Sequence, residues 1–210
     1  MQGAFARLEP LDLARHGDDL WAGVQEPSAD DRWVFLPYGP FTERTEYDAH
    51  LRVQAESAEP LFFAIVRQGD GCACGIASFA NIVADMGTIE IGHVWYAPSL
   101  QQTPAATEAM FLLMREAFDG LGNRRLEWKC NALNQRSSHA AERLGFTYEG
   151  TFRQHKVWKG RNRDTAWYAL VDSDWPPVRR NIEAWLSPEN FNQDGTQRFS
   201  LWTRNAPRNG

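Results

Sequence analysis

The stretch from Asn134 to Phe146 combines residue types that can bind a polar or anionic group. It follows a strand-like run, Leu126–Cys130, in which apolar and polar residues alternate. A short helix is then expected, with Asn134 and Ser137 at its start and Gly145 in the left-handed position that ends many helices. Because the first N–H groups of a helix have no carbonyl partner within it, a ligand could be held here, at one end of a sheet.

A second stretch, the strand-like run Thr88–Tyr96, carries two groups that could take a proton from an amine. These are Glu90 and His93, which strand alternation places on opposite faces unless a bulge at Gly92 intervenes. We favour Glu90 as the general base, acting through a water, with His93 as the second candidate. Two weaker candidates are Glu149 and His155, and the remaining histidines are interpreted as surface residues: His16, His50 and His139.

Hydrophobic periodicity and turn residues predict the elements that would position these groups. Helices are expected at 12–24, at 42–56 with Thr42 as N-cap, at 101–121 with Thr103 as N-cap and Pro104 first in the helix, and at 178–186. Strands are expected at 4–8, 61–66, 74–83, 88–96, 126–130, 146–157 and 165–171. The close spacing of the strands from 61 to 96 indicates an antiparallel meander. A long aromatic loop, 26–40, either lines a site or simply packs over the sheet.

Composition indicates an ordinary globular protein of 210 residues with a net charge of −5, which gives no sign of nucleic-acid binding. No apolar run is long enough for a membrane span, and no signal peptide is expected. Three cysteines in an odd, unpatterned arrangement favour reduced thiols in the cytoplasm and no metal site. The nine tryptophans fit core packing better than an aromatic sugar-binding surface.

Three blocks of sequence, in this order and spacing, resemble the RimJ/RimL-type branch of the GNAT acyltransferase superfamily. The central block is the Asn-x-x-Ser, helix, Leu-Gly-Phe pattern at positions 134–146. The others contain Glu90-Ile91-Gly92-His93 followed by Ala106-Thr107-Glu108-Ala109, and Gly150-Thr151-Phe152-Arg153 followed by Lys159-Gly160-Arg161. Together these blocks extend over roughly half of the chain.

The resemblance implies an α/β (α+β) GNAT fold, in which a mixed, mostly antiparallel sheet has helices on both faces and a V-shaped split between its two central strands. We expect residues 1–176 to form this domain, and residues 177–210 to form a helix followed by a loosely held tail from Ser187. The implied activity is transfer of an acetyl group from acetyl-CoA to a primary amine, by direct attack in a ternary complex. The acceptor would be a protein N-terminus or a small molecule, and a homodimer is compatible with this interpretation.

The resemblance also assigns roles to individual residues. Glu90, Ser137 and His93 would serve catalysis, with Ser137 donating to the leaving thiolate. The donor would contact two groups of residues, namely Val94, Trp95, Tyr96, Gln101, Gln102, Thr103, Ala105, Ala106 and Thr107 in the first, and Asn134, Ser137 and Arg143 in the second. No metal ligand is expected.

Two departures from the family pattern keep other functions open. Gln102 and Pro104 stand where the pyrophosphate turn usually has glycines, and Ala141 stands where many members have a catalytic tyrosine. A donor other than acetyl-CoA, such as succinyl-CoA, is therefore one alternative, and a CoA-binding regulatory module without turnover is another. An all-β binding protein lined with aromatic residues is a more distant one.

Overall fold

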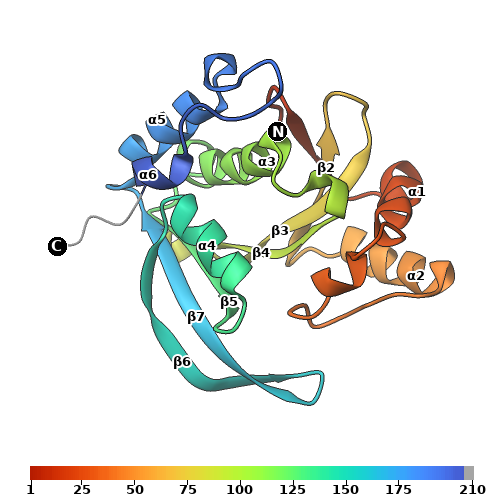
Figure 1. The fold of residues 1–210 in the computed structure, drawn as a ribbon. Coiled ribbons are helices and arrows are strands. Elements are labelled where there is room, and N and C mark those ends of the chain that lie inside the picture. Colours follow the sequence, from red (N-terminus) through yellow and green to blue (C-terminus); the bar gives the residue numbers. More distant parts are fainter. Residues whose placement is uncertain (206–210) are drawn as a thin grey trace. The chain divides into compact units, whose positions relative to one another are not determined.

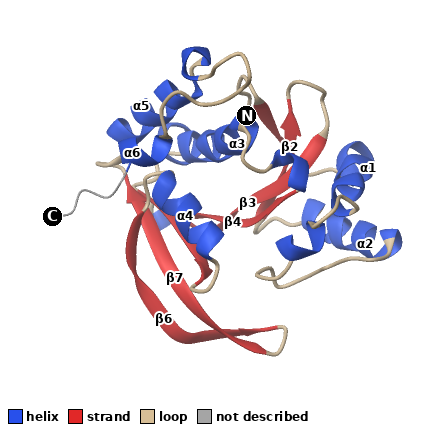
Figure 2. Cartoon of the chain, in the orientation of Figure 1, coloured by secondary structure: helices blue, strands red, loops and turns tan. Residues whose placement is uncertain are grey.

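The computed structural model describes residues 1–205 and divides into two compact units. Unit 1 comprises Met1–Val83 and Ile89–Glu116, and unit 2 comprises Ala84–Thr88 and the residues from Ala117 onward. Both units combine helices with strands (Figures 1 and 2), which confirms the expected mixed α/β class.

Unit 1 is built on strands in the order β1 (Ala6–Pro10), β2 (Leu61–Arg67), β3 (Ala73–Val83) and β4 (Thr88–Tyr96). The pairs β1–β2 and β2–β3 are antiparallel, as a meander requires. Its three helices are α1 (Leu13–Val24), α2 (Arg44–Ala55) and α3 (Pro104–Arg115). A π-helical turn, Glu116–Gly120, follows α3. Strand β4 begins and ends at the residues that the sequence predicts, 88 and 96.

Side-chain caps fix two of the three helix starts in unit 1, and the Thr103 cap is the one that the sequence predicts. Asp12 caps α1 by accepting a hydrogen bond from the Arg15 N–H, and Thr103 caps α3 in the same way. The predicted cap of α2 is wrong, because the helix begins at Arg44 and the Glu43 side chain makes no capping bond. The first turn of α2 is held instead by Arg44, which pairs with Asp48 on α2 and with Asp18 on α1.

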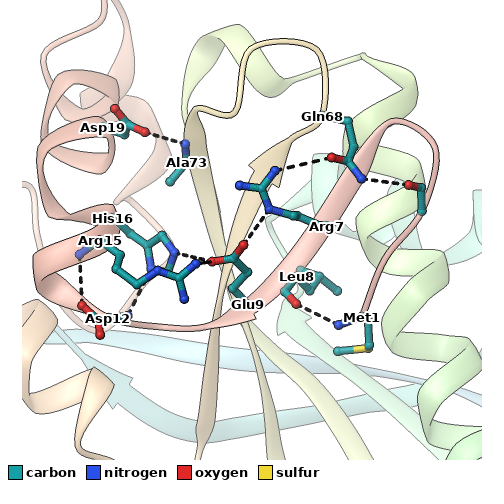
Figure 3. A network of polar contacts seen from close by, with 11 residues as sticks. Met1, Arg7, Leu8, Glu9, Asp12, Arg15, His16, Asp19, Gln68 and Ala73 are labelled. Carbon is teal, nitrogen blue, oxygen red and sulfur yellow. Dashed lines mark hydrogen bonds and ion pairs between the residues drawn. The ribbon is translucent and has the colours of Figure 1, made fainter.

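His16 is buried, at 3% exposure, and not the surface residue that we expected. Its Nδ1 accepts the Asp12 N–H at 3.1 Å, and its Nε2 lies 3.0 Å from a Glu9 oxygen (Figure 3). Glu9 also binds Arg7 and Arg15, and the hydrogen bond from Arg7 contributes most to a pKa below the ordinary value of Glu9, although burial opposes this shift. This network connects β1 to α1 at several points.

Unit 2 has strands in the order β5 (Arg125–Asn131), β7 (Arg161–Val171) and β6 (Thr147–Trp158), and both pairs are antiparallel. Helix α4 (Gln135–Arg143) follows β5, and the chain then turns at Gly145 into β6. Gly145 has φ +95°, and a Cβ there would lie 2.7 Å from a Val178 methyl group. Glycine is therefore needed both for the left-handed helix end and for the close approach of α5 (Trp175–Leu186).

The segment after α5 differs from the loosely held tail that we expected. Trp185 donates to Gln197 at 2.8 Å, Asn190 is buried, and Leu201 is fully buried in α6 (Leu201–Asn205). Polar contacts hold most of this segment, so hydrophobic periodicity could not reveal it. The α5 helix begins at Trp175, so the expected domain limit at residue 176 falls inside a helix; the division into domains stays a prediction. Residues 206–210 lie outside the described residues.

The tryptophans serve mainly as core residues, as we interpreted them. Five of the nine are buried: Trp33, Trp95, Trp128, Trp175 and Trp185. Within residues 1–205, no helix has the length and apolar character needed to cross a membrane. Over the same range, no three side chains are grouped as metal ligands would be.

Candidate active site

Glu90 on β4 is a buried carboxylate, with 8% exposure, held by the neighbouring strand. The Asn81 amide on β3 donates to its Oε2 at 2.6 Å. Asn81 itself has a left-handed backbone, φ +48°, which breaks the regular course of β3 near this contact. This hydrogen bond orients the carboxylate, which can accept hydrogen bonds through both of its oxygens.

His93 interrupts the alternation of β4, because its backbone is left-handed with φ +52°. The irregularity that we placed at Gly92 therefore falls one residue later. The Tyr38 hydroxyl lies 3.1 Å from His93 Nδ1, and the two rings are nearly parallel, with centroids 5.8 Å apart. Phe62 on β2 packs against the same imidazole edge-on. His93 thus faces the loop that contains Tyr38.

That loop packs onto β4 and α2 through an aromatic cluster. Trp33 stacks on Trp95 of β4 at 5.1 Å, and Tyr38 lies 4.2 Å from the ring of His50 on α2. Burial, with a smaller effect from the charge of His93, lowers the pKa of His50 to about 4. Since Trp33 and Trp95 are both fully packed, Trp95 can offer a ligand only its backbone. The cluster shows that the loop packs down over the sheet; whether it also lines an acceptor site stays a prediction.

The turn before α3 has a left-handed residue in spite of its missing glycines. Gln102 takes φ +59°, the conformation that glycine favours, and its side chain is exposed. The Thr103 hydroxyl accepts the Ala106 N–H at 3.2 Å and donates to the Leu100 carbonyl at 2.6 Å. The Tyr96 hydroxyl donates to the Ala106 carbonyl at 3.1 Å and so ties β4 to this helix start. Four more of the residues predicted to contact the acyl-CoA donor lie in this turn or in the first helical residues after it. They are Gln101, Ala105, Ala106 and Thr107.

In unit 2 the predicted residues Asn134 and Ser137 lie together at the start of α4. The Asn134 side chain accepts the Ser137 N–H at 3.2 Å and is therefore an N-cap. The Ser137 hydroxyl accepts the Trp128 indole N–H at 2.9 Å. An indole N–H can only donate, so Ser137 keeps its own proton for another acceptor. Burial raises the pKa of the nearby Cys130 thiol, which agrees with a core residue and not with a nucleophile.

Arg143 lies at the other end of α4, where its guanidinium stacks 4.7 Å above the Trp185 ring. Its backbone carbonyl accepts a hydrogen bond from Asn205. These contacts join α4 to the C-terminal helices. The predicted role of Arg143 at the donor stays a prediction, as do the catalytic roles of Glu90, His93 and Ser137.

Sequence reasoning missed Tyr38 and Asn81, which hold the two candidate bases. Tyr38 could have been singled out only as one of several aromatic residues in a loop. Asn81 was detectable as a polar residue that ends the long apolar part of β3. Neither pattern indicates which side chain the residue contacts.

Comparison with known proteins identifies relatives that match most of the chain. Residues 7–147 match the family described as "Acetyltransferase (GNAT) domain". A GCN5-related N-acetyltransferase of known structure from Brucella melitensis is 44% identical, with a TM-score of 0.95 over 97% of this chain and 92% of that one. The curated protein "Putative ribosomal N-acetyltransferase YdaF" of Bacillus subtilis is 26% identical over 80% of this chain and 90% of its own.

One further solved structure is informative for its ligand. It is the Microcin C7 self immunity acetyltransferase MccE in complex with acetyl-CoA and AMP, at 21% identity and a TM-score of 0.69, over 80% of this chain and 93% of that one. At this identity the likeness concerns the fold alone. With the Brucella structure, it confirms the mixed, mostly antiparallel fold class that we expected; the V-shaped split stays a prediction.

Proposed function

Because the chain belongs to the GNAT acetyltransferase family, we propose that it transfers the acetyl group of acetyl-CoA to a primary amine in a ternary complex. The family uses acetyl-CoA, which is a substrate and not a resident cofactor. The acceptor is a protein N-terminus or a small-molecule amine, and the location is cytoplasmic. The name of the Bacillus relative favours the protein acceptor.

The observation that supports this proposal best is the backbone at the start of α3. Gln102 is left-handed and Thr103 caps the helix, so the turn has the shape that a glycine would give it. Pro104 has no N–H and the Ala106 N–H is bonded to Thr103, so an anion such as the pyrophosphate of CoA would be attracted by the helix dipole and the remaining N–H groups of the turn. The loss of glycine thus changes the side chains at this turn more than its backbone.

The reaction needs no covalent enzyme intermediate, only side chains and N–H groups held close to the two substrates. The neutral amine attacks the thioester carbonyl, a C–N bond forms, the C–S bond breaks, and CoA leaves as its thiolate. In this proposal a backbone N–H of Val94 or Trp95 polarises the carbonyl. Glu90 takes the proton of the amine through a water, and the Ser137 hydroxyl donates to the thiolate. Holding both substrates in place supplies a large part of the rate enhancement.

A second candidate activity is transfer of another acyl group, such as succinyl from succinyl-CoA. Gln102 stands where the family pattern has a glycine, and its exposed amide changes the contacts available to a CoA thioester at this turn. A regulatory module that binds CoA without turnover is the third candidate.

Calorimetric titration with CoA, acetyl-CoA and succinyl-CoA tests these candidates. We expect acetyl-CoA to bind, and Thr103→Ala to weaken binding about threefold to tenfold, because the helix start loses its cap. Thr42→Ala is the matched control, since Thr42 is exposed and does not cap α2. Binding of acetyl-CoA without turnover on a panel of amines would favour the regulatory module, and preference for succinyl-CoA the second activity. No binding of any of the three would overturn the proposal.

A further inference from the structure

The hairpin formed by β6 and β7 carries an unusual concentration of positive charge. Eleven residues, from Arg153 to Arg163, contain five cations and no carboxylate, in a chain whose net charge is −5. We call this segment the basic hairpin. Its cations are Arg153, Lys156, Lys159, Arg161 and Arg163.

In the described part of the chain, two of these cations have no carboxylate partner, unlike several arginines elsewhere in the fold. Arg44, Arg125 and Arg179, for example, each bind two acidic side chains. By contrast, Lys156 and Arg161 make no ion pair with any carboxylate in the part of the chain that the structure describes. Their charge remains available to an external anion.

The pairing of the two strands adds to this concentration. Lys156 lies directly opposite Arg163, and Trp158 lies opposite Arg161. The Arg163 guanidinium stacks 3.6 Å above the Trp158 ring, and the Lys156 ammonium lies 5.8 Å from it. Like charges directly across a ladder are destabilising, so an anion bound here would relieve a repulsion that the fold itself leaves.

The same hairpin presents an edge of the unit 2 sheet. In the order β5-β7-β6, β6 is the terminal strand, and Figure 1 shows it running with β7 as a long two-stranded arm. Phe152 and Val157 on β6 are 53% and 73% exposed. An exposed edge strand can accept another strand through its backbone, and basic side chains on the edge discriminate against strands that are not acidic.

We propose that β6 and the basic hairpin dock an extended, acidic segment of a polypeptide, which adds as a strand beside β6. If the proposed function holds, this polypeptide is the acceptor, which makes the substrate a protein with acidic residues near its reactive amine. The open strand edge favours a polypeptide over a nucleic acid, because a nucleic acid cannot continue a β-ladder.

The test measures binding without any acyl donor, so it does not depend on catalysis. The probe is a fluorescein-labelled peptide of alternating Glu and Thr, as long as the 12-residue β6. An alternating Lys and Thr peptide and a single-stranded DNA oligonucleotide of equal negative charge serve as comparisons. We expect the acidic peptide to bind most tightly, by fluorescence anisotropy at low salt.

The double variant Lys156→Glu/Arg161→Glu is expected to weaken that binding at least about tenfold, because two charges are reversed. The matched control is Arg52→Glu/Arg180→Glu, which changes the net charge equally at two exposed positions outside the hairpin and should leave binding within about twofold. Equal weakening by both double variants would show a non-specific charge effect and would overturn the proposal. So would tighter binding of the oligonucleotide, or no binding of the acidic peptide.

Hydrogen exchange tests the strand addition separately. With the acidic peptide bound, amides within Thr147–Trp158 should exchange more slowly while those of α2 stay unchanged; binding without this protection would exclude the added strand. The double variant should bind acetyl-CoA as the wild type does. If instead the wild type binds the peptide but transfers no acetyl group, the proposed function fails and the docking surface stands.

Discussion

The Tyr38 hydroxyl lies 3.1 Å from Nδ1 of His93, with the two rings inclined by only 7°. This contact fastens the loop before α2 to the left-handed residue of β4. Burial raises the pKa of Tyr38 above its ordinary value. The tyrosine is therefore a neutral hydroxyl throughout the range in which a histidine titrates.

Tyr38→Phe should leave the aromatic packing in place and remove the hydrogen bonds of the hydroxyl, those to His93 and Gln54 among them. We expect a loss of about 1 kcal/mol in the free energy of unfolding, measured by urea denaturation. If His93 serves the reaction, kcat should fall while the KM for acetyl-CoA stays unchanged. In a His93→Asn background the same substitution should have little further effect on kcat; fully additive losses would show that the hydroxyl does not act through His93.

Glu90→Gln should remove the general base and keep the contact with Asn81, because the amide oxygen can still accept that hydrogen bond. We expect kcat/KM to fall by about 10²–10⁴, with loss of the acidic limb of its pH dependence. Glu59→Gln is the control, since the Glu59 carboxylate binds the Ile82 N–H of the same β3 strand. An unchanged pH profile in Glu90→Gln would exclude Glu90 as the base.

Ser137→Ala should destabilise the protein by about 1–2 kcal/mol, because the buried Trp128 indole N–H would lose its acceptor. Trp128→Phe in the alanine background measures the coupling between the two side chains. At a temperature at which the variant is fully folded, acetyl transfer should fall about tenfold if Ser137 also donates to the thiolate. Full turnover in a folded variant would make the serine purely structural.

His50 should make stability depend on pH in a defined window. Its pKa is about 4 in the folded protein and about 6.5 in the unfolded chain, so below pH 6.5 the unfolded state gains a proton that the folded state does not. Stability should therefore fall as the pH drops from 6.5 to 4, by about 1–2 kcal/mol after allowance for partial exposure of the ring.

His50→Phe removes this ionisation. Nε2 of His50 is buried and lacks a hydrogen-bond partner, so phenylalanine should be at least as stable at pH 7.5. Urea denaturation at pH 7.5 and pH 5 should give a smaller difference for His50→Phe than for the wild type. The exposed His139, changed to phenylalanine, is the control; an equal pH dependence in wild type and His50→Phe would refute the assignment.

Substitution of Glu108 on α3 should destabilise the protein more than most substitutions in unit 1. Its buried carboxylate accepts N–H bonds from three successive residues: Ala4 at 2.8 Å, Phe5 at 2.5 Å and Ala6 at 2.7 Å. Glu108→Ala should cost about 3 kcal/mol in thermal or urea unfolding, because these donors lose a charged acceptor. Gly3→Ala should also destabilise, since its Cβ would lie 2.3 Å from Glu108 Cδ. Glu56→Gln, at an exposed position, should be nearly neutral.

The sequence predicts local structure wherever one residue decides it. Thr103 with Pro104 starts α3, and Gly145 ends α4, because capping and left-handed turns depend on residue type. It marks Gly92 as a possible irregularity in β4 but does not predict the left-handed His93, because glycine is the residue that such a backbone favours. Nor does it predict the burial of His16, which depends on Glu9 from a different element. The candidate site follows the same rule: its residues were found by residue type or by resemblance to a family, and their contacts only in the structure.

At the start of α3, Gln102 keeps the left-handed backbone that a glycine would adopt but adds a side chain that glycine lacks. A non-glycine residue in the left-handed region carries a conformational cost of about 1 kcal/mol, which the surrounding turn must absorb. Exchange between glutamine and glycine at this position would then alter the chemistry of the turn with little change in its path. This turn is therefore a place where related enzymes can differ in their side-chain contacts while the rest of the fold stays the same.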